Sequence, residues 1–162
     1  MKAIDYLMEE HREISIFLDE MEDYCTSIIG GEKLNEDKFR QAIIYIREFA
    51  DGTHHKKEED ILFKYMLEEL GQTGKTLIQN GMLVEHDLAR LSVYQLEEAL
   101  DSYQLESNNK NILDILSNMM NYIYILRRHI DKEDRLVYKF ALDNLSEKSK
   151  KAIEQEFLKE IK

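Results

Sequence analysis

The sequence predicts an all-α protein: an up-down-up-down four-helix bundle followed by a short C-terminal helix. The first reason is composition, because the chain has no proline, only six glycines and many strong helix formers such as Leu, Glu and Lys. The second is that apolar residues recur at spacings of three and four along four long stretches, as in helices with one buried face. The connections between these stretches are short, which favours antiparallel neighbours. We therefore expect a single domain over residues 1–162, with the bundle at about 3–143.

The first two helices are predicted over residues 3–29 and 36–70. Gly30 follows the apolar pattern of the first helix and should end it. Asn35 is suited to be the N-cap of the second helix, because its side chain can accept a hydrogen bond from a free backbone N–H. Gly52 interrupts the second helix, either as a small-residue contact between helices or as a local kink.

The remaining helices are predicted over residues 75–106, 110–143 and 146–160. A break marked by Gly71 and Gly74 precedes the third helix, and a turn of polar residues separates the third from the fourth. The last helix is short and amphipathic. We therefore expect it to cover one end or one side of the bundle.

Charge and composition exclude several classes of function. The formal net charge is −11, whereas nucleic-acid binding and docking on an anionic membrane both need a basic surface. No apolar run approaches the roughly 20 residues of a membrane span, and the first residues lack the apolar core of a signal peptide. Cys25 is the only cysteine, so no disulfide can form within the chain. These features predict a cytoplasmic protein with no nucleic-acid or membrane partner.

One stretch of the sequence occurs twice, because residues 54–63 and 129–138 align without a gap. In each copy a histidine stands four residues before a glutamate, so a helix places both side chains on one face, one turn apart. The aligned polar pairs are His54 with His129, Lys57 with Lys132, Glu58 with Glu133, and Glu59 with Asp134. Two helices with the same His-x-x-x-Glu pair indicate a two-metal site between helices.

The spacing leaves a choice in the first copy, because His55 and Glu59 are related in the same way as His54 and Glu58. We favour His54 and Glu58, since the apolar residues that follow both copies then align. The apolar stripe earlier in the same helix, through Ile46 and Ala50, also points at residue 54. His55 and Glu59 are then expected to face solvent, or at most to contact the ligands.

Two further histidines, His11 and His86, stand on the apolar faces of the first and third helices. When residues are counted from the start of each predicted helix, His11, His54, His86 and His129 all fall near the middle of their helices. Since neighbouring helices run in opposite directions, the four histidines then lie at similar depths. Buried carboxylates and imidazoles are costly without partners. Two metal ions, each glutamate bridging both, would satisfy the whole set. The predicted ligands are His11, His54, Glu58, His86, His129 and Glu133.

The donor types indicate which metals fit this site. Imidazole with carboxylate suits iron, and manganese or zinc is possible, whereas no thiolate is available to favour zinc or an iron–sulfur cluster. Four imidazoles and two bridging glutamates leave about four of roughly twelve positions free on octahedral counting, so the site is open to a small ligand. Glu85, next to His86, could be a further ligand or could accept a hydrogen bond from an imidazole.

Four motifs are specific when taken together: Glu10-His11-Arg12, His54-x-x-x-Glu58, Glu85-His86-Asp87 and His129-x-x-x-Glu133. Through them the chain resembles the hemerythrin-like family, also called the HHE cation-binding domain, over residues 5–140. The resemblance implies a four-helix bundle with two non-haem iron ions. It implies the same six ligands.

The third helix separates two kinds of family member. Oxygen-carrying hemerythrins have a His-x-x-x-His pair there, whereas this chain has Met82 four residues before His86. The pattern therefore resembles more closely the bacterial members implicated in the repair of iron centres under oxidative or nitrosative stress. This implies a protein that binds or reduces oxygen, peroxide or nitric oxide with an unidentified electron donor. The alternative is an iron- or oxygen-sensing module without turnover, and a metal-free structural bundle ranks last.

Overall fold

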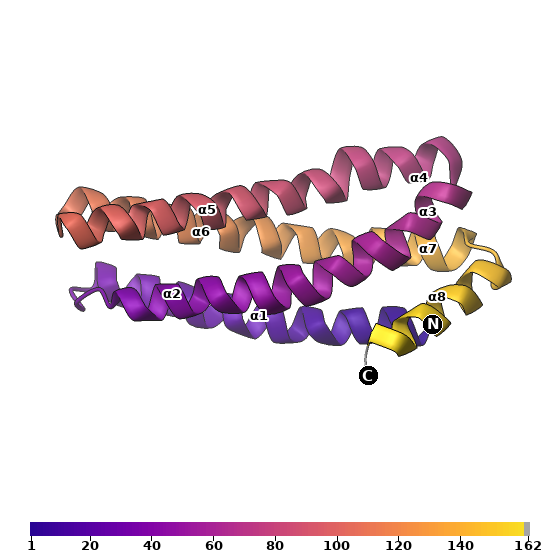
Figure 1. Cartoon of the computed structure of the whole chain (residues 1–162), viewed down its shortest axis with the longest axis horizontal. Coiled ribbons are helices and arrows are strands. Elements are labelled where there is room, and N and C mark those ends of the chain that lie inside the picture. The colour runs from indigo at the N-terminus through magenta and orange to yellow at the C-terminus, as the bar shows by residue number, and fades with distance from the viewer. Residues whose placement is uncertain (161–162) are drawn as a thin grey trace.

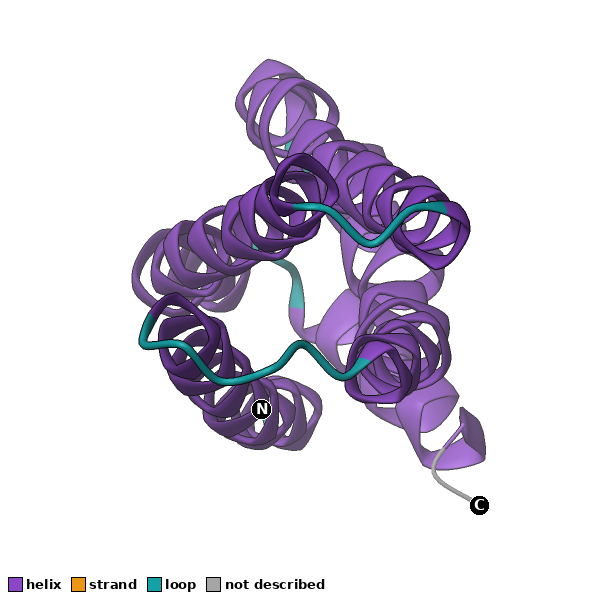
Figure 2. Cartoon of the chain, turned by 90° about the vertical axis from the view of Figure 1, so that its left-hand side faces the viewer, coloured by secondary structure: helices purple, strands orange, loops and turns teal. Residues whose placement is uncertain are grey.

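The computed structural model describes residues 1–160, and within this range the chain is all-helical, without strands. Long helical rods lie side by side along one axis, which gives the elongated, bundle-like shape in Figure 1. Seen along that axis, the rods surround a common centre (Figure 2). The end of the predicted domain, residues 161 and 162, lies outside the described range.

Each long rod except the first is made of consecutive α-helical and π-helical segments. The first rod is α1 (Lys2–Ile29), and the second joins α2 (Glu36–Tyr45), η1 (Ile46–His55), η2 (Glu58–Phe63) and α3 (Lys64–Glu69). The third joins α4 (Gly71–Leu77), η3 (Ile78–Met82) and α5 (Leu83–Leu105). The fourth joins α6 (Asn109–Lys132), η4 (Glu133–Val137) and α7 (Tyr138–Asn144), and α8 (Glu147–Glu160) follows.

The predicted helix ends are largely confirmed. Asn35 caps α2, since its Oδ1 accepts a hydrogen bond from the Asp37 backbone N at 3.0 Å. The first helix ends at Ile29, and the chain then turns at Gly31, whose φ of 103° is costly for residues with a Cβ. The third rod begins earlier than expected: its break lies at Gly71, with φ 58°, while residue 74 is already helical.

The rods are not wholly α-helical, because π-helical turns occur in the second, third and fourth rods. At Gly52, inside η1, an added Cβ would lie 2.6 Å from the carbonyl oxygen of Arg47, five residues earlier. This glycine therefore permits the close backbone approach of a π-helical turn, which decides between a helix contact and a local distortion. Such turns occur frequently at functional sites.

Two apolar clusters fill the interior, one on each side of a polar layer. Along α1, Ala3, Ile4 and Leu7 belong to one cluster, and Ile14 and Leu18 belong to the other. The polar layer between them contains buried histidine and glutamate side chains from all the long rods. The fold thus brings polar residues that are distant in sequence to one level of the bundle.

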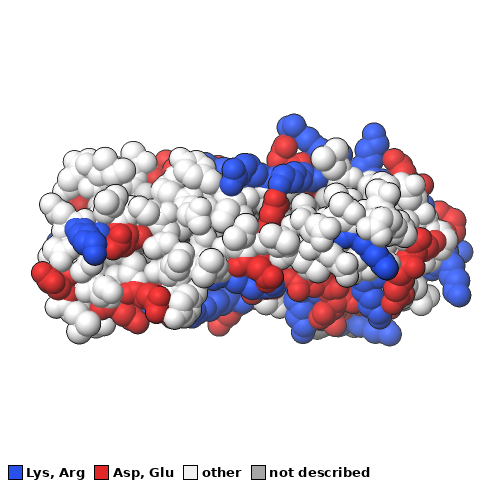
Figure 3. Space-filling model, turned by 90° about the horizontal axis from the view of Figure 1, so that it is seen from above, with Lys and Arg blue, Asp and Glu red and all other residues white. Residues whose placement is uncertain are grey.

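The short helix α8 packs against α1 and η2, as expected for a helix that covers one end of the bundle. Its Ile153 and Phe157 are buried in the apolar cluster on that side. On the face in Figure 3, charged side chains of both signs gather over the half that carries α4 and are sparser over the other half. Among the described residues, no helix combines the length and apolar character needed to cross a bilayer.

Candidate metal centre

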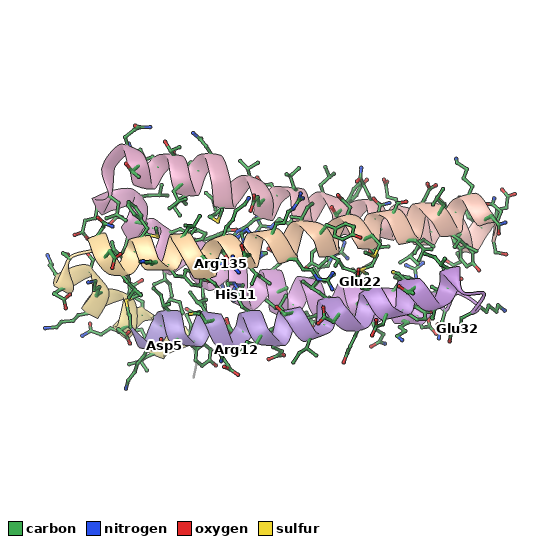
Figure 4. All side chains as sticks on the ribbon, turned by 180° about the vertical axis from the view of Figure 1, so that it is seen from behind. Asp5, His11, Arg12, Glu22, Glu32 and Arg135 are labelled. Carbon is green, nitrogen blue, oxygen red and sulfur yellow. The ribbon has the colours of Figure 1, made fainter. Side chains whose placement is uncertain are left out.

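The six predicted ligands are all buried in the polar layer, each with at most 1% of its surface exposed. His11 lies on the inner side of α1, whereas the adjacent Arg12 points outward (Figure 4). His54 and Glu58 come from η1 and η2, and His86 comes from α5. The last two predicted ligands lie at the junction of α6 and η4. The prediction that the set meets at one level of the bundle is confirmed.

The donor atoms form two adjoining groups, and within each group they lie within 4.8 Å of one another. The first, here called the His11 group, comprises His11, His54, Glu58 and Glu133. The second, the His86 group, comprises His55, Glu58, His86 and His129. Glu58 belongs to both groups, as a bridging carboxylate would.

Glu133 also reaches both groups. Its Oε2 lies 3.2 Å from Nε2 of His11 and 3.1 Å from Nε2 of His129. Glu58 Oε2 lies 3.5 Å from Nε2 of His54 and 3.6 Å from Nε2 of His86. The four imidazoles of the predicted set therefore all direct Nε2 at the two carboxylates.

The expectation for His55 was wrong, because its side chain is buried and not solvated. Its ring stacks on the ring of His86 with a centroid distance of 3.8 Å, and it belongs to a donor group. In a regular α-helix, neighbouring side chains diverge widely around the axis, so facing His54 inward should turn the next residue away. The π-helical segment η1 has more residues per turn, which lets both histidines face the interior.

Every imidazole of the layer has a carboxylate at Nδ1, on the side away from the donor groups. The Nδ1-to-oxygen distances are 2.8 Å for His11–Asp134, 2.9 Å for His54–Glu10, 3.3 Å for His55–Asp51, 2.7 Å for His86–Glu59 and 3.0 Å for His129–Glu85. An ionised carboxylate only accepts, so Nδ1 carries the proton and donates it. When the imidazole is neutral, its Nε2 lone pair is then free for a metal.

Cationic side chains fix these outer carboxylates in turn. Lys57 pairs with Glu10, and Lys132 pairs with Glu85. Arg90 donates to Glu59 at 2.7 Å. Of the two roles foreseen for Glu85, the structure therefore favours hydrogen bonding to an imidazole. Apart from Glu85, and from the contact with the ligands allowed for Glu59, the sequence did not predict these partners, whose acidic and basic types are common on any solvated helix face.

The buried carboxylates and imidazoles of the layer shift one another's pKa values. Burial and the nearby Glu133 raise the pKa of Glu58 well above its usual range. Burial would also raise the pKa of Glu133, but the imidazoles of His129 and His11 hold it well below its usual range. Burial lowers the pKa of His11 and of His129, yet their carboxylate neighbours more than offset this and raise them to about 9 and about 10.

Several of the donor atoms that face the centre of the layer lack hydrogen bonds. Nε2 of His54, Nε2 of His55, Oε2 of Glu58 and both carboxylate oxygens of Glu133 have no hydrogen-bond partner among the described residues. Such buried polar atoms are costly and are normally satisfied. Metal ions would satisfy them, so the donor set fits bound cations.

A tyrosine that sequence reasoning counted as an apolar residue also reaches the layer. The Tyr138 hydroxyl donates to Oε1 of Glu58 at 2.5 Å and lies 3.3 Å from Nε2 of His11. Its ring is buried and stacks on His11 at a centroid distance of 5.5 Å. The only sequence signal is its alignment with Phe63 in the twin stretch, where the two rings differ by one hydroxyl group.

A cavity of about 100 Å³ lies beside the His86 group. His55, Asp51 and Arg90 line its polar side, together with Tyr122, whose buried hydroxyl has no hydrogen-bond partner among the described residues. The cavity is large enough for a few atoms only, so it suits a small molecule.

Comparison with known proteins agrees with this geometry. The family model of the hemerythrin HHE cation-binding domain matches residues 2–141. No curated protein sequence and no solved structure matches the chain. A match over this much of the chain, with buried His and Glu clusters at the level that the motifs predict, shows that the chain belongs to the hemerythrin HHE cation-binding domain family.

Proposed function

We propose that this protein holds two iron ions in the polar layer and that it binds or reduces a small oxidant there. The observation that carries the proposal is the set of unpartnered buried donors, because Oε2 of Glu58 and both carboxylate oxygens of Glu133 face imidazole Nε2 atoms without a hydrogen-bond partner among the described residues. The scaffold is taken to be the up-down-up-down four-helix bundle that the short connections favour.

The two donor groups suggest how the ligands are shared. His11 and His54 would hold one ion, and His86 and His129 the other, with both glutamates reaching the two ions. His55 is a candidate fifth imidazole for the second ion, since its Nε2 has no hydrogen-bond partner. The outer carboxylates would keep each imidazole in the tautomer that binds metal.

The donor set supports iron, with manganese or zinc as possible substitutes, because it combines imidazole with carboxylate. Cys25 packs in an apolar cluster and takes no part in either donor group. Bound iron would supply open coordination positions and one-electron redox chemistry for oxygen, peroxide or nitric oxide.

The protein's own contribution is positioning and access. Apolar clusters on both sides of the layer exclude bulk water. The cavity lined by His55 and Arg90 provides space for a small polar molecule next to the His86 group. The motif pattern favours a cytoplasmic role in oxidative or nitrosative stress. In this role a separate donor would supply the electrons.

Although Met82 stands where oxygen carriers have a histidine, the number of imidazole donors no longer distinguishes this chain from them. The residue packs in an apolar cluster, but His55 supplies a fifth imidazole from another rod. Reversible oxygen binding and oxidant reduction must therefore be distinguished by reactivity.

A sensing module is the second candidate, and the buried carboxylate pair favours it. Burial and, after it, the charge of the nearby Glu133 raise the pKa of Glu58, so two ionised carboxylates at these positions are unfavourable without a cation. Loss of metal should therefore loosen the layer and could report iron or oxygen to a partner.

The test is anaerobic reconstitution with ferrous iron, followed by metal analysis and rapid mixing with oxygen, hydrogen peroxide or nitric oxide. We expect two irons per chain and a fast absorbance change in the near ultraviolet with at least one oxidant. A reversible change would indicate a binding or sensing role, and an irreversible oxidation would indicate reductase chemistry. Fewer than one iron per chain would contradict the proposal.

Glu69→Gln is a matched control for variants in the layer. Glu69 is an acidic residue of the same rod, but it is exposed, accepts a hydrogen bond from the backbone N of Ser146 and belongs to neither donor group. Its substitution should leave both the iron content and the oxidant reaction unchanged.

A further inference from the structure

The repeat in this chain extends well beyond the twin stretch. Residues whose numbers differ by 75 match around the whole layer: Glu10 with Glu85, His11 with His86, His54 with His129, Lys57 with Lys132, Glu58 with Glu133, and Glu59 with Asp134. The two halves of the bundle therefore present the same acidic, basic and imidazole side chains to the centre.

The contacts repeat as well as the residue types. Glu10 binds His54 and Lys57, just as Glu85 binds His129 and Lys132. Across the halves, His11 bonds to Asp134 as His86 bonds to Glu59. The layer is thus pseudo-symmetric in space, so a departure from the repeat marks a real difference between the donor groups.

Two residues that reach the donor groups depart from the repeat. Tyr138 corresponds to Phe63, and His55 corresponds to Ile130. Each half therefore adds one polar donor that the other half lacks. The hydroxyl lies at the His11 group, and the additional imidazole lies in the His86 group.

The Tyr138 and Phe63 rings occupy equivalent places. Both are buried, and each stacks on the histidine of its own side, at 5.5 Å from His11 for Tyr138 and 5.9 Å from His86 for Phe63. Packing is therefore satisfied by a phenyl ring at either position. The hydroxyl of Tyr138 is an addition that the core does not require.

That hydroxyl lies at the spacing of a donor atom. Its distance of 3.3 Å from Nε2 of His11 matches the 3.2 Å from the same nitrogen to Oε2 of Glu133 within the His11 group. It also contacts Glu58, the carboxylate shared by the two groups. A metal held by His11 and Glu58 would therefore have the phenol oxygen within reach.

We infer that Tyr138 is an oxygen ligand of the metal at the His11 group, so that the two metal positions differ although the chain repeats. The inference rests on the proposed iron centre. Coordination replaces the O–H bond by an oxygen–metal bond, and the released proton passes to solvent. One position then has two imidazoles and a phenolate, and the other has three imidazoles, including that of His55.

The test is Tyr138→Phe, compared with Tyr122→Phe as a matched control. Both variants remove one buried hydroxyl, and Phe63 shows that a phenyl ring fits the equivalent position. Tyr122 lines the cavity at His55, but its hydroxyl, unlike that of Tyr138, has no hydrogen bond to a residue of the donor groups. Each protein is reconstituted, oxidised to the ferric form, analysed for iron and examined by resonance Raman spectroscopy in its visible absorption band.

We expect the unmodified protein and Tyr122→Phe to bind two irons and to show phenolate vibrations enhanced in a phenolate-to-iron charge-transfer band. Tyr138→Phe should lose these vibrations while it keeps iron in the His86 group. If the unmodified protein holds two irons without phenolate vibrations, or if Tyr138→Phe keeps them, this inference is overturned while the iron centre stands. A protein that binds no iron overturns both.

Discussion

The two halves of the bundle share their predicted ligands but differ in the path from the polar layer to the surface. In the half that contributes His55, a chain of polar contacts continues outward, since Asp51 accepts from Nδ1 of His55 at 3.3 Å and from Nε of Arg90 at 2.9 Å. The corresponding residues 75 positions away are Ile130, Leu126 and Ser15.

The repeat therefore supplies the donor side chains that both halves share, and its departures leave a polar path to the surface on one side only. Leu126 and Ile130 are buried apolar residues, so the equivalent path on their side is closed. On the other side, the side chain of Arg90 is 38% exposed, and Arg90 and Asp51 both line the cavity. The two halves can therefore be compared residue by residue, and matched substitutions test which features they share.

The largest effect is expected at the shared carboxylates. Glu58→Gln keeps the size of the side chain but replaces a charged oxygen in both donor groups by an amide. We expect iron content to fall from two ions to at most one per chain, as measured by mass spectrometry of the digested protein. Glu133→Gln should act similarly if the halves are equivalent, and two irons in both variants would contradict bridging.

Metal removal should lower stability more than any single outer substitution. Binding to the folded state alone contributes about 2.7 kcal/mol per site when free metal is 100 times its dissociation constant. For a chain of 162 residues, the melting temperature should fall by roughly 5–10 °C per site. Calorimetry of the loaded and chelated protein measures this. Equal melting temperatures would show that the layer is stable without metal.

The lysine–glutamate pairs should separate the halves, because their exposure differs. The side chain of Lys57 is 7% exposed, whereas that of Lys132 is 45% exposed. Glu10→Ala leaves a buried ammonium group unpaired and should cost about 3 kcal/mol of unfolding free energy. Glu85→Ala should cost about 1 kcal/mol or less, since water solvates Lys132.

Chemical denaturation of both metal-free variants gives these two free energies. The unmodified chain, denatured under the same conditions, is the reference. Equal losses would mean that burial of the lysine does not distinguish the two pairs.

The smallest effect is expected on the surface, where both halves again carry an arginine–glutamate pair. Arg47 Nη2 lies 2.6 Å from Oε2 of Glu97, and Arg127 binds Glu22, the residue 75 positions before Glu97. Exposed pairs of this kind contribute only about 0.2–1 kcal/mol. Glu97→Gln should therefore change stability by less than about 1 kcal/mol and leave the iron content unchanged.

The pH dependence of this pair has a definite sign. The Arg47 guanidinium lowers the pKa of Glu97 below the 4.5 of a free glutamate. Its contribution is therefore present above about pH 4.5 and is lost as the pH falls through the lower value of the folded state. A double-mutant cycle of Arg47→Ala and Glu97→Gln, at pH 7 and near pH 3, measures the coupling. Stronger coupling at the lower pH would contradict the pairing.

The sequence by itself determined the helical class, the helix ends at Gly30 and Asn35, and the level at which the buried histidines meet. These features follow from local chemistry, since periodicity shows which face of a helix is buried and a repeat fixes the register of two helices. The six predicted ligands were found in this way, and all six lie in the donor groups. Their binding of iron stays a prediction.

Only the tertiary structure decided the inward position of His55 and the contact of Tyr138 with Glu58 and His11. The first depends on a π-helical turn, whose wider backbone changes the direction of neighbouring side chains. The second depends on the way the fourth rod places Tyr138 of α7 opposite His11 of α1 and Glu58 of η2. Periodicity assigns a residue to a face of its own helix, but it carries no information about which atoms of other helices lie opposite that face.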